Sequence, residues 1–339
     1  ARSASAFWRA GTGRAMGALM SEVRLTLALE AGAVHLPTAG PIAVFRPPAD
    51  TDLAALPRER VRIVQGFRAA HDAWAARGYA VAPHGAGDHA GAVVFVPRGK
   101  ALARALIAEA LAPGGPVIVD GQKTDGIDSL LREVRARANV SDPFAKAHGK
   151  CFMLEAGPAT FADWAAPPVL RQPSGWVTAP GLFSADGPDP GSVALGRALP
   201  PKMPGRVADL GAGWGYLSFQ VLERRGVTEC ALVEAEHAAL EAARANIADE
   251  RARFLWADAT ACGGGPFDHV VTNPPFHQGR AADPSLGAAF IAAAARMLGP
   301  HGTLWLVANR HLPYEAPLRA AFHELRELEG GGTAFKLYA

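Results

Sequence analysis

Apolar residues gather along the chain in short runs of strand length, separated by Ala-rich stretches with helical spacing. In the second half these runs cover residues 206–210, 229–234, 252–256, 269–272 and 303–307. Regular alternation of strand-length and helix-length segments is typical of α/β folds with a mainly parallel sheet. Two more runs, 324–328 and 333–338, surround three glycines at 330–332. Glycine tolerates the positive φ of a hairpin turn, so we predict a closing antiparallel pair.

The first half of the chain repeats this plan. Residues 111–120 and 298–307 each combine a helix end, a Pro/Gly turn and an apolar run. Each segment follows an Ala/Leu-rich helix, predicted over 101–111 in one half and over 286–298 in the other. The repeated order predicts two tandem Rossmann-like domains with mainly parallel sheets. Chance similarity between two Pro-Gly turns is the alternative interpretation.

Pro and Gly cluster between residues 157 and 201, so we place the domain boundary there. The predicted organisation is a first domain over 20–160, a linker over 161–200 and a second domain over 201–339. Residues 1–19 lack apolar periodicity and a signal-peptide core. We predict that they form a flexible extension, and whether it belongs to the native protein stays open.

Composition narrows the class of protein. Hydrophobic residues make up 49% of the chain and charged residues 19%, as in globular proteins, while a net charge of +2 gives no nucleic-acid signature. The three cysteines are far apart and show no metal-ligand spacing, which predicts no metal site and a reducing, cytoplasmic setting. No apolar run reaches the roughly 20 residues of a membrane span. The longest, 288–298, predicts a buried helix.

A glycine-rich loop follows the run at 206–210. Gly211 and Gly213 let the backbone turn and approach a ligand, and Gly215 lets the next helix pack closely. A dinucleotide fingerprint needs Gly or Ala at position 216, where this chain has Tyr216. Asp209, two residues before the first glycine, suits a cationic, amino-bearing ligand better than a pyrophosphate.

Two more carboxylates end the following strands. Glu234 lies where an acceptor would hold both ribose hydroxyls, and Asp258 lies where one would accept from an adenine amine. Ordinary strand-end solubilising residues are the alternative for each acid taken alone. The glycine loop and the three acids together resemble motifs I to III of the class I S-adenosylmethionine methyltransferases.

A rigid loop, Asn273-Pro274-Pro275-Phe276, follows the run at 269–272, and we predict that it is the catalytic loop. The two prolines fix φ and remove two backbone donors. The amide oxygen of Asn273 and the carbonyl of Pro274 could accept both hydrogens of an aryl amine and aim its lone pair at a methyl donor. Phe276 offers a ring face on which a flipped base can stack. A purely structural double-proline turn is the alternative.

Three stretches carry a closer resemblance, over residues 181–192, 273–279 and 307–314. They resemble the bacterial ribosomal RNA guanine-N2 methyltransferases of the RsmC/RlmG type. The resemblance covers residues 175–339 well and the amino half loosely. It implies a duplicated architecture, with a degenerate amino-terminal methyltransferase-like domain and an active, seven-stranded class I carboxy-terminal copy.

The resemblance also implies roles for individual residues. Phe183, Ser184 and Asp186, in the linker, would help to close the cofactor pocket as a lid. Asn309 and Tyr314 would border the substrate side.

His277 is harder to assign from the resemblance. It would contact the base or a phosphate, or it is a structural loop histidine, and we do not expect it to act as a general base.

The amino half departs from an active enzyme at both functional loops. Its counterpart of the glycine loop, 42–48, has no glycine, and its counterpart of the catalytic loop, 96–100, has neither Asn nor an aromatic residue. We expect this half to support the fold or guide RNA. Its candidate phosphate contacts, which are otherwise an ordinary solvated surface, are Arg98, Lys100, Lys123, Lys146 and Lys150.

The resemblance implies methyl transfer from S-adenosyl-L-methionine to the exocyclic N2 amine of a guanine in ribosomal RNA, first of all in the small subunit. Adenine N6 in nucleic acid and a protein glutamine are alternative substrates. A cofactor-binding RNA scaffold without turnover is an alternative of another class. We expect a cytoplasmic monomer whose partner is ribosomal RNA or a ribosomal subunit, without membrane attachment.

Overall fold

The computed structural model describes residues 23–167, 169–275, 277–278, 281–282 and 284–339. The expected extension at 1–19 lies outside the described residues. The chain forms two compact units, one up to residue 166 without 67–69, and one made of 67–69 and 167–339. The segment expected as a linker therefore belongs, from residue 167 onward, to the second unit by its contacts.

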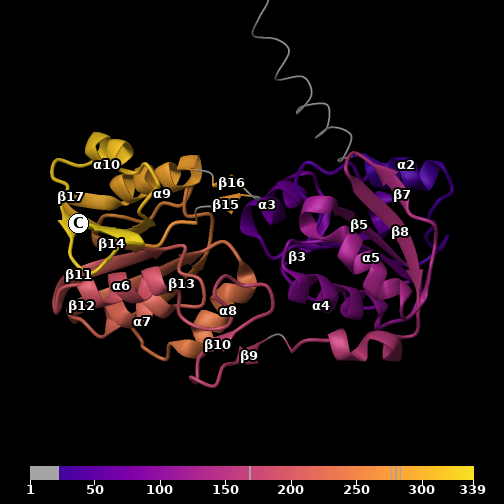
Figure 1. Ribbon diagram of the computed structural model, residues 1–339, viewed down its shortest axis with the longest axis horizontal. Coiled ribbons are helices and arrows are strands. Elements are labelled where there is room, and N and C mark those ends of the chain that lie inside the picture. Colours follow the sequence, from indigo (N-terminus) through magenta and orange to yellow (C-terminus); the bar gives the residue numbers. More distant parts are fainter. Residues whose placement is uncertain (1–22, 168, 276, 279–280, 283) are drawn as a thin grey trace, which may run out of the picture. The chain divides into compact units, whose positions relative to one another are not determined.

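The second unit holds a seven-stranded sheet in the order β13-β12-β11-β14-β17-β19-β18 (Figure 1). Its strands are β11 (Lys202–Leu210), β12 (Arg225–Glu234), β13 (Ala252–Trp256), β14 (Phe267–Thr272), β17 (Leu298–Asn309), β18 (Glu327–Leu328) and β19 (Phe335–Tyr338). The first five are parallel, and β19 runs antiparallel to both β17 and β18. The five predicted parallel strands and the closing antiparallel pair are thus confirmed.

Helices cover both faces of this sheet. They are α6 (Pro190–Ala198), α7 (Tyr216–Leu222), α8 (His237–Asn246), α9 (Pro284–Met297) and α10 (Glu315–Ala321). In Figure 1, α6, α7 and α8 lie on one side of the sheet and α9 and α10 on the other. Successive residues of β11 point to opposite faces, so Val207 packs with the first helix group and Ala208 with the second. The predicted buried helix is α9, whose apolar face fills the second core.

The first unit has strands β1 (Ile42–Phe45), β2 (Val61–Val64), β3 (Ala80–Ala82), β4 (Gly91–Phe95), β5 (Val117–Gln122), β6 (Asn139–Val140), β7 (Phe144–Lys146) and β8 (Gly149–Glu155). Its helices are α2 (Arg24–Glu30), α4 (Lys100–Leu111), α5 (Ile127–Arg135) and α3 (Arg68–Ala76) from residue 70 onward. Short 3-10 turns lie at Arg58–Arg60, Lys123–Asp125 and Pro158–Trp164. Strand order is β3-β2-β1-β4-β5-β8-β6, with β7 beside β8. With β7 left aside and the strands of each sheet numbered from its own first strand, the two sheets have the same strand order.

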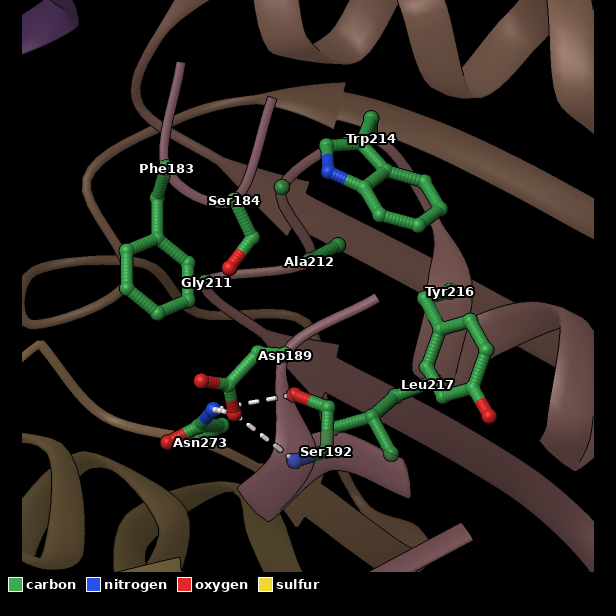
Figure 2. A pocket seen from close by; sticks show the side chains of 11 residues that line it. Phe183, Ser184, Asp189, Ser192, Gly211, Ala212, Trp214, Tyr216, Leu217 and Asn273 are labelled. Carbon is green, nitrogen blue, oxygen red and sulfur yellow. Dashed lines mark hydrogen bonds between the residues drawn. The ribbon is translucent and has the colours of Figure 1, made fainter. Parts of the chain in front are cut away.

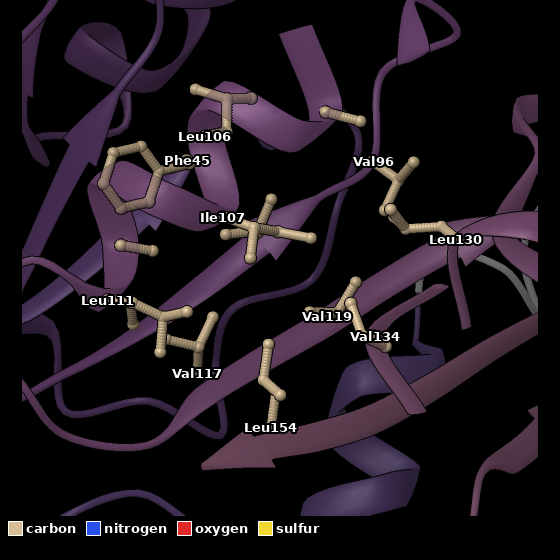
Figure 3. Packing of buried hydrophobic residues seen from close by; sticks show 14 of the residues in the cluster. Phe45, Val96, Leu106, Ile107, Leu111, Val117, Val119, Leu130, Val134 and Leu154 are labelled. Atoms are coloured by element: carbon tan, nitrogen blue, oxygen red, sulfur yellow. The ribbon is translucent and has the colours of Figure 1, made fainter. Parts of the chain in front are cut away.

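Apolar side chains from α4, α5 and one face of this sheet fill a core in the first unit (Figure 3). Ile107 of α4 and Val119 of β5 are fully buried there. A second core lies on the other face, where α2 adds Leu25. Each face of the sheet therefore buries its own apolar layer, as parallel sheets require.

Arg24 and Asp120 form a buried ion pair in the first unit, with both Asp120 oxygens accepting from the guanidinium at 2.8 and 2.6 Å. The pair fastens α2 to the carboxyl end of β5. In the described part of the chain, no helix is long and apolar enough to cross a lipid bilayer.

Candidate functional site

The glycine-rich loop joins the carboxyl end of β11 to α7. Gly211, Gly213 and Gly215 all have positive φ, at +73°, +55° and +93°, which side chains with a Cβ rarely adopt. A Cβ on Gly215 would lie 2.9 Å from the side chain of Ile247, whereas one on Gly213 would meet open space. Gly215 is thus required for helix packing, and Gly213 leaves room for a ligand.

Asp209 lies beneath this loop, with none of its surface exposed. One carboxylate oxygen accepts from the Ser218 hydroxyl at 2.6 Å, while Oδ1 is buried without a hydrogen-bond partner among the described residues. Burial raises the pKa of Asp209 to about 7. From the sequence we predict this acid beside a cationic ligand, whereas the structure places it beneath the glycine loop and outside the lining of the cleft.

Glu234 and Asp258 end neighbouring strands and fix the adjoining turns. Glu234 accepts backbone N–H groups of Gly213 at 2.8 Å and of Glu236 at 2.7 Å, and its burial raises its pKa. Asp258 Oδ1 accepts from the backbone and the hydroxyl of Thr260 at 2.8 and 2.7 Å. Both acids therefore lie at the carboxyl edge of the sheet, where parallel α/β folds bind ligands.

A small cleft opens above the glycine loop (Figure 2). Phe183 is 61% exposed and, with Ser184, forms part of the wall that the linker segment contributes. The lining residues are Phe183, Ser184, Asp189, Ser192, Gly211, Ala212, Gly213, Trp214, Tyr216, Leu217 and Asn273.

Residues 170–185, called the strap below, are fastened to the rest of the second unit by Asn246. The strap contains the two-stranded pair β9 (Leu170–Arg171) and β10 (Val177–Thr178). Val177 N donates to Asn246 Oδ1 at 2.7 Å, and Asn246 Nδ2 donates to the carbonyls of Val177 and Trp214, both at 2.8 Å. Trp176 also packs 5.2 Å, between ring centroids, from both Trp214 and Phe219. The strap is thereby held against the loop.

Asn273 follows β14 and faces the glycine loop across the cleft. The hydroxyl of Thr272, just before it, donates to the carbonyl of Leu210 at 2.7 Å and so holds the ends of β14 and β11 together. Asn273 Nδ2 donates to Asp189 Oδ2 and to Ser192 Oγ, both at 2.9 Å. Its amide nitrogen is therefore engaged by α6, and its oxygen remains as an acceptor.

The other predicted site residues fall in several places. Pro274 is buried and Pro275 is exposed. Phe276 lies outside the described residues. Of His277, in β15 (His277–Gln278), only the backbone is described. β15 pairs with β16 (Ala281–Ala282).

Three further predicted residues lie outside the lining of the cleft. Asp186 is exposed and Asn309 half-buried at the end of β17. Tyr314 is 1% exposed and packs in the core against Gly287 of α9. The structure thus brings together Phe183, Ser184, Gly211, Gly213 and Asn273.

Asp189 and Ser192 are not among the predicted site residues, although both lie in a segment that carries the family resemblance. The signal was available, because Asp-Pro-Gly-Ser at 189–192 has the form of a helix start with Asp as N-cap and Pro at the first helical position. Trp214, Tyr216 and Leu217 of the cleft lie in or beside the glycine loop and were also missed.

Comparison with known proteins places the chain among methyltransferases. Residues 175–339 match the family described as "Methyltransferase small domain". The ribosomal RNA small subunit methyltransferase C of Shewanella oneidensis is 31% identical over 260 residues, which cover 73% of this chain and 75% of that protein. The chain belongs to the ribosomal RNA small subunit methyltransferase C family.

Other members of the small subunit methyltransferase C family agree with this assignment. The Shewanella halifaxensis protein is 29% identical over 262 residues, covering 73% of this chain and 76% of its own length. A solved structure of the T. thermophilus 16S ribosomal RNA N2 guanine methyltransferase RsmC, in complex with AdoMet and guanosine, is 26% identical with a TM-score of 0.71. That match covers 90% of this chain and 88% of the other.

The chain therefore carries the α/β fold of class I methyltransferases, with mixed sheets. Among the residues that the structure describes, no group of three or more His, Cys, Asp or Glu side chains could hold a metal ion. Cys151, Cys230 and Cys262 are free thiols.

Proposed function

We propose that this protein transfers a methyl group from S-adenosylmethionine to the exocyclic N2 amine of a guanine in small-subunit ribosomal RNA. The observation that carries the proposal is Asn273, whose amide oxygen is left as an acceptor at the cleft while both amide hydrogens are engaged. An acceptor beside a glycine loop suits a substrate that presents an NH₂ group. The named functions of the relatives support the same reaction.

The cleft fits S-adenosylmethionine on three observations. Open space above Gly213 admits a ligand close to the backbone. The buried carboxyl of Asp209, beneath the glycine loop, keeps one oxygen without a partner in the described structure, which is an acceptor available to a donor. Glu234 and Asp258 each keep acceptor capacity for hydroxyl and amine donors.

When bound, the cofactor supplies a methyl group activated by its sulfonium. The residues of the chain hold and orient the other reactant. Asn273 Oδ1 and the Pro274 carbonyl would accept the two N2 hydrogens, so that the nitrogen lone pair faces the methyl group. An aryl amine is a weak base and gains most from such alignment, and the excess proton leaves to water after transfer.

The amino-terminal unit is best explained as a second methyltransferase-like copy without a cofactor site. Its strand order matches that of the active unit. At the position of the glycine loop, β1 runs into Arg46, Pro47 and Pro48. We infer that this unit supports the fold or guides ribosomal RNA, in a cytoplasmic monomer whose partner is ribosomal RNA or a ribosomal subunit.

The basic residues proposed as phosphate contacts differ in their surroundings. Lys100 lies 2.5 Å from Glu133, and Lys150 lies 2.7 Å from Asp128. Because these two lysines already have carboxylate partners, we expect a smaller contribution to RNA binding from them than from Lys123 and Lys146.

Nucleoside mass spectrometry tests the proposed reaction. Ribosomal RNA from cells lacking this gene should lack one N2-methylguanosine, and the purified protein with cofactor should restore it. Asn273→Ala should lower the rate by at least about 100-fold, since alignment of the amine would be lost. Asn139→Ala, on an exposed edge strand of the first unit, is the matched control and should keep full activity.

Methylation of adenine N6 or of a protein glutamine in place of guanine would contradict the substrate assignment. Cofactor binding without any transfer would favour the RNA scaffold instead.

A further inference from the structure

The start of α6 forms a small hydrogen-bond network around the amide of Asn273 (Figure 2). Asp189 is the N-cap of this nine-residue helix, and its Oδ2 accepts from Ser192 N at 2.9 Å. The same oxygen accepts from Asn273 Nδ2 at 2.9 Å, and Ser192 Oγ lies 2.9 Å from the same nitrogen. One helix start therefore holds both hydrogens of the catalytic-loop amide.

This network decides which end of the Asn273 amide faces the substrate. An amide can rotate by half a turn and exchange its acceptor oxygen with its donor nitrogen at little change in shape. In the rotated form, the oxygen of Asn273 would face the carboxylate of Asp189, and two acceptors would oppose each other. The donor nitrogen would then point toward the substrate amine, which offers only hydrogens at that position.

The two partners do not contribute equally to this choice. The hydroxyl of Ser192 can donate as well as accept, so it would satisfy either orientation of the amide. The carboxylate of Asp189 can only accept, so it permits one orientation alone. Asp189 is therefore the group that discriminates.

We propose that Asp189 is a positioning residue that locks the Asn273 amide with its oxygen toward the substrate amine. The inference rests on the proposed function, since an amine substrate is what makes an acceptor useful. Asp189 acts through Asn273, and only its Oδ2 takes part in this role. The chemistry it selects is a substrate with an exocyclic NH₂, in preference to a keto oxygen at the same place.

Steady-state kinetics on three variants test the proposal. Asp189→Ala should lower kcat about 100-fold while the Kd for S-adenosylmethionine, measured by calorimetry, stays within about threefold. Asp189→Asn retains one acceptor oxygen that can serve both Ser192 N and Asn273 Nδ2, so it should restore kcat to within about tenfold of wild type. Ser192→Ala should lose less than Asp189→Ala.

Arg197→Ala is the matched control, because it changes the exposed last turn of the same helix and leaves the network intact. Unchanged kcat in Asp189→Ala would overturn the proposal. So would a loss explained entirely by cofactor affinity. Equal loss in Asp189→Asn and Asp189→Ala would also overturn it, since the negative charge itself would then be acting on the substrate.

A second readout does not depend on turnover. In protein labelled with ¹⁵N at asparagine, the side-chain amide signals of Asn273, assigned with Asn273→Ala, should show slow hydrogen exchange in the wild type. They should shift and exchange faster in Asp189→Ala but not in Arg197→Ala. Unchanged amide signals in Asp189→Ala would refute the lock itself. A protected amide in a wild-type protein that fails to methylate guanine would count against the proposed function and leave the lock standing.

Discussion

Replacing Asp209 with Asn tests how the floor of the cofactor cleft is stabilised. Asp209 is completely buried, its only hydrogen-bond partner in the described structure is Ser218, and burial raises the pKa of Asp209 from 3.8 to about 7. Such a rise corresponds to about 4 kcal/mol between the two protonation states. Asn has almost the same shape and carries no charge at any pH.

The sign of the effect follows from proton binding. Between pH 3.8 and about 7 the unfolded chain releases the proton of this carboxyl while the folded chain keeps it. The free energy of unfolding of the wild type therefore falls as pH rises through this window. Asp209→Asn does not have this loss, so between low pH and pH 8 its free energy of unfolding should rise by up to about 4 kcal/mol relative to that of the wild type. At every pH this difference is reduced by about 1–3 kcal/mol, the cost of burying an amide with unsatisfied hydrogens.

Two measurements check this expectation. Hydrogen exchange of the β11 and β12 amides, followed across about pH 5 to 8, isolates the stability of the second unit from that of the first. The ¹³C carboxyl shift of Asp209, assigned by its loss in Asp209→Asn, gives the pKa directly. A stability difference that does not vary with pH, or a pKa below about 5, would show that burial does not hold the proton on Asp209.

Asp249→Asn is the control of opposite sign. Asp249 accepts from Arg251, and this interaction lowers the pKa of Asp249. Its contribution to stability is present above about pH 4 and is lost as pH falls through the lowered pKa, so its effect should be constant from pH 5 to 8.

Four further changes should separate packing from ligand binding. Gly215→Ala combines positive φ with a clash against α8, so it should destabilise the second unit by about 1–3 kcal/mol in thermal unfolding. Gly213→Ala shares the positive φ but meets no other atom, so it should destabilise the unit less and weaken cofactor binding in calorimetry. Asn246→Ala removes three hydrogen bonds to the strap and loop and should cost about 2–4 kcal/mol, seen as faster proteolysis within residues 170–185. Arg24→Ala leaves the buried carboxylate of Asp120 without its cation and should cost about 3–5 kcal/mol of stability in the first unit without changing the cofactor Kd. A changed Kd would contradict the assignment of the cofactor site to the second unit alone.

The sheet of the second unit could be predicted from sequence because its strands are nearly continuous apolar runs. Runs at 252–256 and 269–272 mark β13 and most of β14, and the flanking helices separate them cleanly. Strand ends were predicted less well, since β17 extends from Leu298 through Gly and Pro positions that a periodicity argument assigns to a turn. Neighbouring strands extend pairing there, as between Phe267 and Leu298.

The site was predictable where a backbone requirement selects a residue type. The glycine loop and Asn273 meet at one cleft because parallel strands end at the same edge of the sheet. Residue type alone could not separate a pocket wall from a core position. For that reason Tyr314 and Asp209 were predicted to line the site, although both are buried. Asp189 was missed because its partner is 84 residues away, and only the fold brings the two together.

Helix α6 begins in the cleft and continues into the hydrophobic core. Ser192, near its start, faces Asn273, whereas Leu195 and the residue just after the helix, Leu199, are 0% and 4% exposed among the side chains of the adjoining sheet. A closely packed interior transmits a change of one methylene as a shift of the helix. Substitutions at the two leucines are therefore limited by their effect on the reaction as well as by stability. Even an exchange of one aliphatic residue for another would move the amide of Asn273, so compensating substitutions should arise on the sheet face beneath α6.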